Sequence, residues 1–200
     1  MNLFQGANSA ATFLILSALV AGLAKTLGAA QQDPFQYLFG HPEFLYLGLF
    51  ILIFRVKTFL DDHRHFAEPV QDKTAFRYAG FILAIISWFF WGLAAYLLST
   101  PEWASELMAA SLLVSTMWIA VHVVEIFVDP ERRNTEAFTA VIREKWVFLN
   151  CGYILCLIAY VGAFHPVIDA GDPKPLVALL ALLLLDILTS RSFRGIIKTA

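Results

Sequence analysis

Residues 54–68, FRVKTFLDDHRHFAE, decide the fold of this chain, because a long apolar run becomes charged there. The run begins near residue 42, and Arg55 and Lys57 lie just inside its end. Asp61 and Asp62 follow directly after it. About 20 apolar residues are enough for a helix to cross the hydrocarbon core of a bilayer. The stretch therefore predicts a membrane-spanning helix that leaves the bilayer through a charged rim.

The composition extends this prediction to the whole chain. Of its 200 residues, 59% are hydrophobic and 15% are charged, and the mean hydropathy is +0.69. These values lie outside the usual range of soluble domains. We expect an all-α, polytopic integral membrane protein that forms a single transmembrane domain over residues 1–200, with no separate soluble domain.

Six apolar segments are long enough to be spanning helices, and they pair into three hairpins. They cover residues 10–30, 42–60, 77–99, 102–128, 146–165 and 175–190. The first is the weakest because Lys25 lies in its outer half, so a five-helix arrangement with a re-entrant first segment stays open. Its small residues form a seam suited to close packing: Ala10, Ser17, Ala21, Ala24 and Gly28.

The lysine and arginine residues predict the orientation. Twelve of the fourteen lie on one side of the six-helix arrangement. Five lie between the second and third segments or at the end of the second, four between the fourth and fifth, and three after the sixth. Basic residues near the ends of spans stay in the cytoplasm. Both termini are therefore predicted to be cytoplasmic, and we expect the protein in a bacterial inner (plasma) membrane.

The segment at 102–128 carries a polar stripe on one helical face. Residues spaced alternately by three and four form it: Met108, Ser111, Ser115, Trp118, His122, Glu125 and Asp129. Because a histidine or carboxylate facing lipid is energetically costly, this face is expected to meet protein or water. Interhelical packing and a solute pathway both stay open. In a pathway, His122 beside Glu125 would make transport pH-dependent between about pH 5 and 8.

Polar residues in the last two segments are expected to face this stripe. Asn150 and Tyr153 share one helical face. Asp186 follows the run VALLALLLL and needs a cation or a hydrogen-bond donor at its depth. We expect Arg55 to pair with Asp186 or with Glu125, as a structural ion pair or as a gate.

The charged rim itself allows more than one interpretation. Lys57 and Asp61 are four residues apart and suit an ion pair along a helix, with Asp62 beside them. Asp61 and His65 have the residue types and spacing of metal ligands, but such a cluster in a solvated loop is usually a polar rim. We predict no metal and no cofactor. Nucleic-acid binding is not predicted either, because the membrane topology already accounts for the basic residues.

Three classes of function stay open for such a chain. The first is a small homo-oligomeric channel or carrier for an ion or small solute, with the polar stripe at 102–128 lining the pathway. The second is a non-catalytic subunit, anchor or signalling component of a larger membrane assembly. The third is a membrane-embedded enzyme acting at the cytoplasmic face. The expected partners are the lipid bilayer and either further copies of the chain or other membrane subunits.

Overall fold

The structure, a computed structural model, describes residues 3–29, 33–65, 75–128, 145–165 and 167–190. Within these ranges the protein is all-α and has seven helices. They are α1 (Leu3–Ala29), α2 (Pro34–Gly40), α3 (Pro42–His65), α4 (Ala75–Tyr96), α5 (Pro101–Val128), α7 (Trp146–Val161) and α8 (Lys174–Thr189). The all-α prediction is confirmed for the described residues.

Three of these helices are long and apolar enough to cross a membrane. Their apolar stretches are Phe4–Gly28 in α1, Tyr78–Tyr96 in α4 and Pro101–Val121 in α5. Helix α7 is apolar but shorter, since its 16 residues span about 24 Å. Helix α3 is long enough, but Arg55, Lys57 and Asp61 make its second half charged. The three apolar helices indicate an integral membrane protein.

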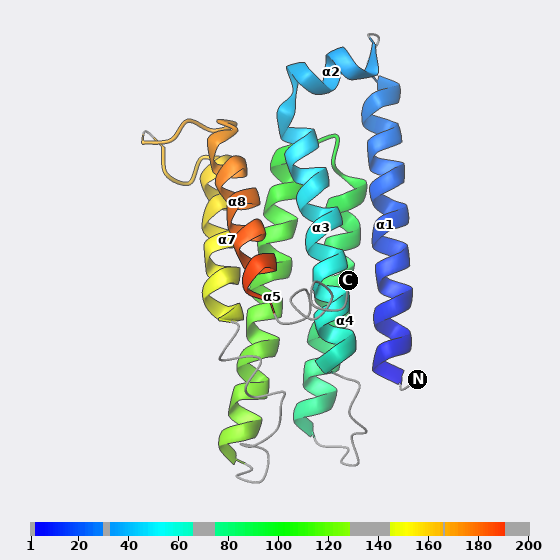
Figure 1. Ribbon diagram of the computed structural model, residues 1–200, viewed down its shortest axis with the longest axis vertical. Helices are drawn as coiled ribbons and strands as arrows, with labels where there is room; N and C mark the ends of the chain where they lie inside the picture. Colours follow the sequence, from blue (N-terminus) through cyan, green and yellow to red (C-terminus); the bar gives the residue numbers. More distant parts are fainter. Residues whose placement is uncertain (1–2, 30–32, 66–74, 129–144, 166, 191–200) are drawn as a thin grey trace.

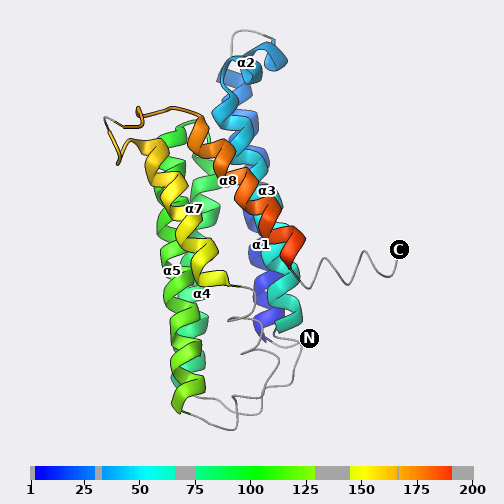
Figure 2. The same ribbon diagram turned by 60° about the vertical axis from the view of Figure 1, so that its left-hand side comes forward.

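The six longer helices form a closed ring. Helix α1 packs against α3 and α4, α4 against α5, α5 against α7, α7 against α8, and α8 against α3. Figures 1 and 2 show that helices which follow one another along the chain, among these six, run in opposite directions along the long axis. Large apolar side chains lie on the outside of the ring, such as Phe13, Phe89 and Leu184, which are each more than half exposed. Such an exterior suits contact with lipid rather than with water.

Proline marks where two of the long helices begin. Helix α3 starts at Pro42 and α5 starts at Pro101, because the N–H that proline lacks has no partner in a first turn anyway. Helix α7 ends where Gly162 takes a left-handed conformation, with φ of 99°, which favours glycine. These local signals set the ends of the helices that surround the ring interior.

The short helix α2 was not among the predicted segments. Asp33 begins it by accepting a hydrogen bond from the backbone N–H of Phe35 at 2.9 Å, which is the usual role of an N-cap aspartate. Seven residues are too few for the apolar repeat that identifies a longer helix.

The predicted small-residue seam of α1 faces the wrong way for packing within this chain. All five of its residues are exposed. The buried face of α1 is instead formed by Asn8, Ile15, Leu19, Gly22 and Thr26. This face packs inward because burying its larger apolar side chains stabilises the protein more than burying alanine would. A polar contact on the same face adds to the packing.

The interior of the ring differs between its two halves. The half toward α2 is filled with apolar side chains that are fully buried, including Leu47, Phe50, Leu98, Leu112 and Leu157. The other half, where α1 begins and α8 ends (Figure 1), holds the buried charged residues. This second half contains the candidate site.

Candidate functional site

A cavity of about 70 Å³ lies inside the ring among α1, α3, α4, α5, α7 and α8. Four ionisable side chains line it: Arg55, Lys57, Asp61 and Asp186. Four of the five tryptophans of the chain line it as well: Trp88, Trp91, Trp118 and Trp146. A cavity of this volume with polar walls has room for a few water molecules.

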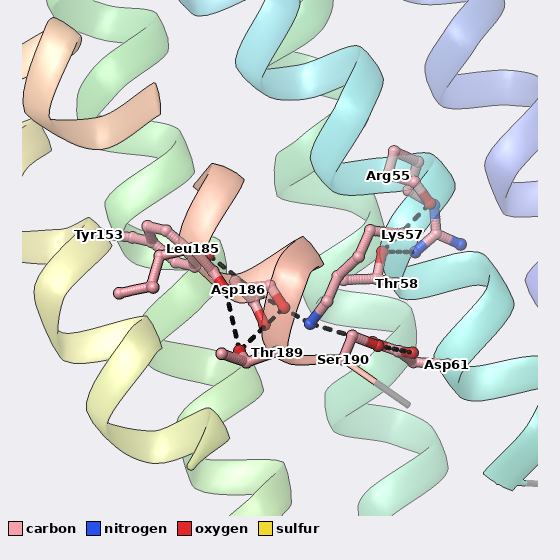
Figure 3. Close-up of polar contacts among 9 residues, drawn as sticks. All are labelled: Arg55, Lys57, Thr58, Asp61, Tyr153, Leu185, Asp186, Thr189 and Ser190. Atoms are coloured by element: carbon pink, nitrogen blue, oxygen red, sulfur yellow. Dashed lines mark hydrogen bonds and ion pairs between the residues drawn. The ribbon is translucent and has the colours of Figure 1, made fainter. Parts of the chain in front are cut away.

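Lys57 is the centre of the charged part of the cavity (Figure 3). Its Nζ atom lies 3.0 Å from Oδ2 of Asp61 and 2.8 Å from Oδ2 of Asp186. All three side chains are at most 4% exposed. Because burying a charge without a partner is costly, the two carboxylates and the ammonium hold one another in place. We call these three residues the charged triad.

Two hydroxyl groups complete the triad. Tyr153 donates a hydrogen bond to Oδ2 of Asp186 at 2.9 Å. Ser190 donates one to Oδ1 of Asp61 at 3.3 Å. The triad and its donors therefore connect three helices, since Lys57 and Asp61 lie on α3, Tyr153 on α7 and Asp186 on α8.

Arg55 faces α1 rather than α8. It donates hydrogen bonds to the side chain and backbone oxygens of Asn8 and to Oγ1 of Thr12, the last at 2.7 Å. Its Cζ atom lies 5.6 Å from the ring centroid of Trp88, within range of a cation–π contact. The predicted ion pair between Arg55 and Asp186 is therefore wrong, because Lys57 is the cation beside Asp186.

Helix geometry explains why Lys57, and not Arg55, is the partner of Asp186. Residues two positions apart along an α-helix are separated by about 200° around its axis. Arg55 and Lys57 consequently leave α3 on nearly opposite sides, as Figure 3 shows. Glu125, the alternative partner predicted for Arg55, has a side chain outside the described part of the structure.

The described residues of the polar stripe of α5 point into the protein. Met108, Ser111 and Trp118 are buried. Oγ of Ser87 on α4 lies 2.8 Å from Oγ of Ser111 and 2.8 Å from Oγ of Ser115, so the serines join α4 to α5. Ser115 and Trp118 also line the cavity. The same stripe therefore packs α5 against α4 and lines the cavity.

The remaining predicted residues divide into two groups. Asn150 lines the cavity and donates a hydrogen bond to Thr116 on α5 at 3.3 Å, and Tyr153 is fully buried against the triad. The side chains of Asp62, His65 and His122 lie outside the described part of the structure, and Asp129 is also outside it. The metal site suggested for Asp61 and His65 is therefore not described, and Asp61 itself pairs with Lys57.

Sequence reasoning missed several residues of this region. Asn8 and Thr12 lie at the depth of Arg55 on α1 and accept its hydrogen bonds, and Ser87 interrupts an apolar run in α4. A polar residue inside an apolar helix was the available signal. Asn8 lies before residue 10, near which the sequence predicts the first segment to begin.

Comparisons with other proteins assign no family to this arrangement. No protein-family model, curated protein or solved structure matches the chain. The function is therefore inferred from the geometry of the cavity and its side chains.

Proposed function

We propose that this protein is a small membrane carrier for an ion or a small solute, and that the cavity around the charged triad is its binding site. One observation carries the proposal: four ionisable side chains line one cavity among the six longer helices. Ionisable residues within membrane proteins are costly, and they commonly mark pathways for substrates or ions.

The apolar half of the ring interior, toward α2, favours a carrier over an open channel. Next to the cavity, the ring is filled by side chains with no exposed surface, among them Phe50, Met108, Leu112, Leu157 and Leu179. A solute in the cavity could reach the other side of the membrane only after these helices moved apart. Access that alternates between two sides is the mode of action of carriers.

The proposal includes a membrane topology. We infer that α3, α7 and α8 cross the bilayer together with α1, α4 and α5, giving six spans in three hairpins with both termini in the cytoplasm of a bacterial inner membrane. The alternating helix directions (Figures 1 and 2) support this inference. The cavity then lies in the cytoplasmic half.

The pathway belongs to one chain in this proposal. Ser111 and Trp118 on α5 are buried inside the ring, so the stripe supports a pathway within the protein rather than along an axis shared by several copies. A homo-oligomer would repeat the site in each copy.

Flux into proteoliposomes tests the proposal. Purified full-length protein is reconstituted, and uptake of alkali cations, ammonium, chloride and small amino acids is measured for the wild type and for Asp186→Asn. We expect uptake of at least one member of this panel and a strong reduction by the substitution. Asp172→Asn is the matched control, because Asp172 also pairs with a lysine, Lys174, at 3.0 Å, but at an exposed position.

The possible results separate the three classes of function. No flux of any member of the panel would contradict the carrier proposal, and stable co-purification with other membrane proteins would then favour a subunit. Turnover of a lipid headgroup at the cytoplasmic face, lost in Asp186→Asn, would favour an enzyme.

A further inference from the structure

The cavity contains a carboxylate oxygen to which no described residue donates a hydrogen bond. Lys57 and Tyr153 both reach Oδ2 of Asp186, and no described residue donates a hydrogen bond to Oδ1. Asp186 lines the cavity and is 2% exposed. A buried carboxylate oxygen normally accepts at least one hydrogen bond, so Oδ1 is available to a donor inside the cavity.

Asn150 offers a second acceptor on the same cavity. Its amide nitrogen donates to Thr116, and its carbonyl oxygen accepts no hydrogen bond from the described residues. It lines the cavity and is 7% exposed. Asn150 lies one turn before Tyr153 on α7, so its side chain is on the face that meets Asp186. Asp186 and Asn150 therefore offer two acceptor atoms to a donor inside the cavity.

The charges of the triad agree with these two acceptors. One ammonium, on Lys57, is shared by two carboxylates. Asp61 makes further contacts besides those with Lys57 and Ser190, whereas the hydrogen bonds to the carboxylate of Asp186 fall on a single oxygen. The guanidinium of Arg55 is turned away toward Asn8 and Thr12 (Figure 3). One further positive charge at Oδ1 would complete the pairing of Asp186.

The aromatic walls indicate which cation fits. Indole faces attract cations, and two cations of the chain already use them: Nζ of Lys57 lies 5.8 Å from the ring centroid of Trp146, and Arg55 lies over Trp88. Trp91 and Trp118 also line the cavity. Hard metal cations require a shell of oxygen ligands, which walls rich in indole supply poorly. An ammonium ion needs only hydrogen-bond acceptors and aromatic faces.

We propose that the cavity binds one small ammonium-type cation, ammonium or methylammonium, through Oδ1 of Asp186 and the amide oxygen of Asn150. The volume of about 70 Å³ has room for a cation of this size. This inference deepens the proposed function and rests on it for transport, because it names the solute class of the same cavity. Binding itself can be measured without transport.

Tryptophan fluorescence of the full chain in nanodiscs tests the binding. The variant Trp103→Phe serves as background, because Trp103 is 63% exposed and is the one tryptophan that does not line the cavity. Titration with methylammonium chloride should give a saturable change, whereas sodium chloride at equal ionic strength should not. In Asp186→Asn the apparent Kd should rise at least about tenfold, since a hydrogen bond to a charged group is lost. Asp172→Asn should bind like the background.

Two results would overturn the proposal. The first is an equal response to sodium and methylammonium, and the second is an unchanged Kd in Asp186→Asn. If Asp186→Asn does not yield folded protein, thermal unfolding of the wild type decides. A ligand that binds the folded state raises its Tm, so methylammonium must raise the Tm more than sodium does, and equal Tm values would refute the site.

Uptake of labelled methylammonium into proteoliposomes separates this inference from the function on which it rests. Saturable binding without uptake would keep the cation site and contradict the carrier. Uptake of another solute class, without any methylammonium binding, would keep the carrier and overturn the cation site.

Discussion

At the scale of single residues, the position of a side chain around its helix decides its partner. Arg55 and Lys57 lie at nearly the same depth of α3, yet Arg55 contacts α1 and Lys57 contacts α8. Depth can be read from the length of an apolar run, whereas the direction around the axis depends on which helix packs on which side.

Loss of Lys57 should destabilise the protein strongly. Lys57→Met leaves Asp61 and Asp186 buried without their shared ammonium, and removing one partner of a buried pair costs about 3–5 kcal/mol in soluble proteins. The free energy of unfolding in a denaturant titration measures this loss. Adding Asp186→Asn removes one of the two unpaired charges. The free energy of unfolding of the double variant should therefore fall by less than the sum of the decreases in the two single variants.

The exposed pair at the other end of the molecule supplies the control. Lys174 pairs with Asp172 at 3.0 Å, but its side chain is 88% exposed. Lys174→Met should therefore change the stability little, because exposed pairs are solvated and screened. Equal losses for Lys57→Met and Lys174→Met would contradict the buried triad.

Asp172 should make a small, pH-dependent contribution to stability. The backbone N–H of Lys174 and its ammonium both donate to Asp172, and these bonds lower the pKa of that carboxyl group. A lowered pKa stabilises the folded state above the ordinary value of about 4, and this stabilisation is lost as the pH falls. The Tm difference between the wild type and Asp172→Asn should thus shrink from pH 7 to pH 3, and a constant difference would contradict it.

At the scale of helices, close approach of two backbones holds α1 in the ring. Gly22 packs directly on the backbone carbonyl of Ala95 in α4, where a Cβ atom would have no room. Thr26 donates a hydrogen bond to the carbonyl of Gly22 at 2.8 Å on the same buried face. One glycine thus permits the contact that the predicted seam of exposed small residues does not make.

Two substitutions in α1 should have opposite effects. Gly22→Ala places a methyl group against Ala95 and should cost about 1–3 kcal/mol of stability. Gly28→Ala meets nothing within 4 Å and should stabilise the helix by about 0.5–1 kcal/mol. Thermal unfolding of both variants provides the measurement. The packing of α1 on α4 would be refuted if both changes stabilised the protein equally.

At the scale of the whole molecule, the ring differs from a soluble protein in its apolar exterior and its buried charges. Apolar side chains such as Val20 and Leu188 are at least 60% exposed outside, while Lys57 and Asp186 are at most 3% exposed inside. In a bilayer the exterior loses little by being apolar, and polar groups are satisfied by one another. The same sequence in water would expose most of its exterior unfavourably.

The proposed topology can be tested by reporter fusions. Fusions after residues 30, 100 and 171 should report the periplasm, and fusions at both ends should report the cytoplasm, because the basic residues stay inside. A cytoplasmic report at residue 100 would contradict six spans. The same report at residue 30 alone would support the five-helix arrangement.

The sequence by itself determined that this is an all-α protein with helices suited to a membrane, because long apolar runs and charge asymmetry are local and can be counted. It also placed Asp186, Tyr153 and Ser115 in the interior, since a polar side chain in an apolar helix needs a hydrogen-bond or ionic partner. It did not reveal α2, whose seven residues are too few for a repeat.

Only the tertiary structure decided which helices are neighbours. The partner of Asp186, the face of α1 that packs, and the enclosure of four tryptophans around one cavity all depend on the ring order. That order is set by contacts between segments far apart in the chain, such as Arg55 with Asn8. Periodicity along one helix carries no information about the identity of the helix that will cover its polar face.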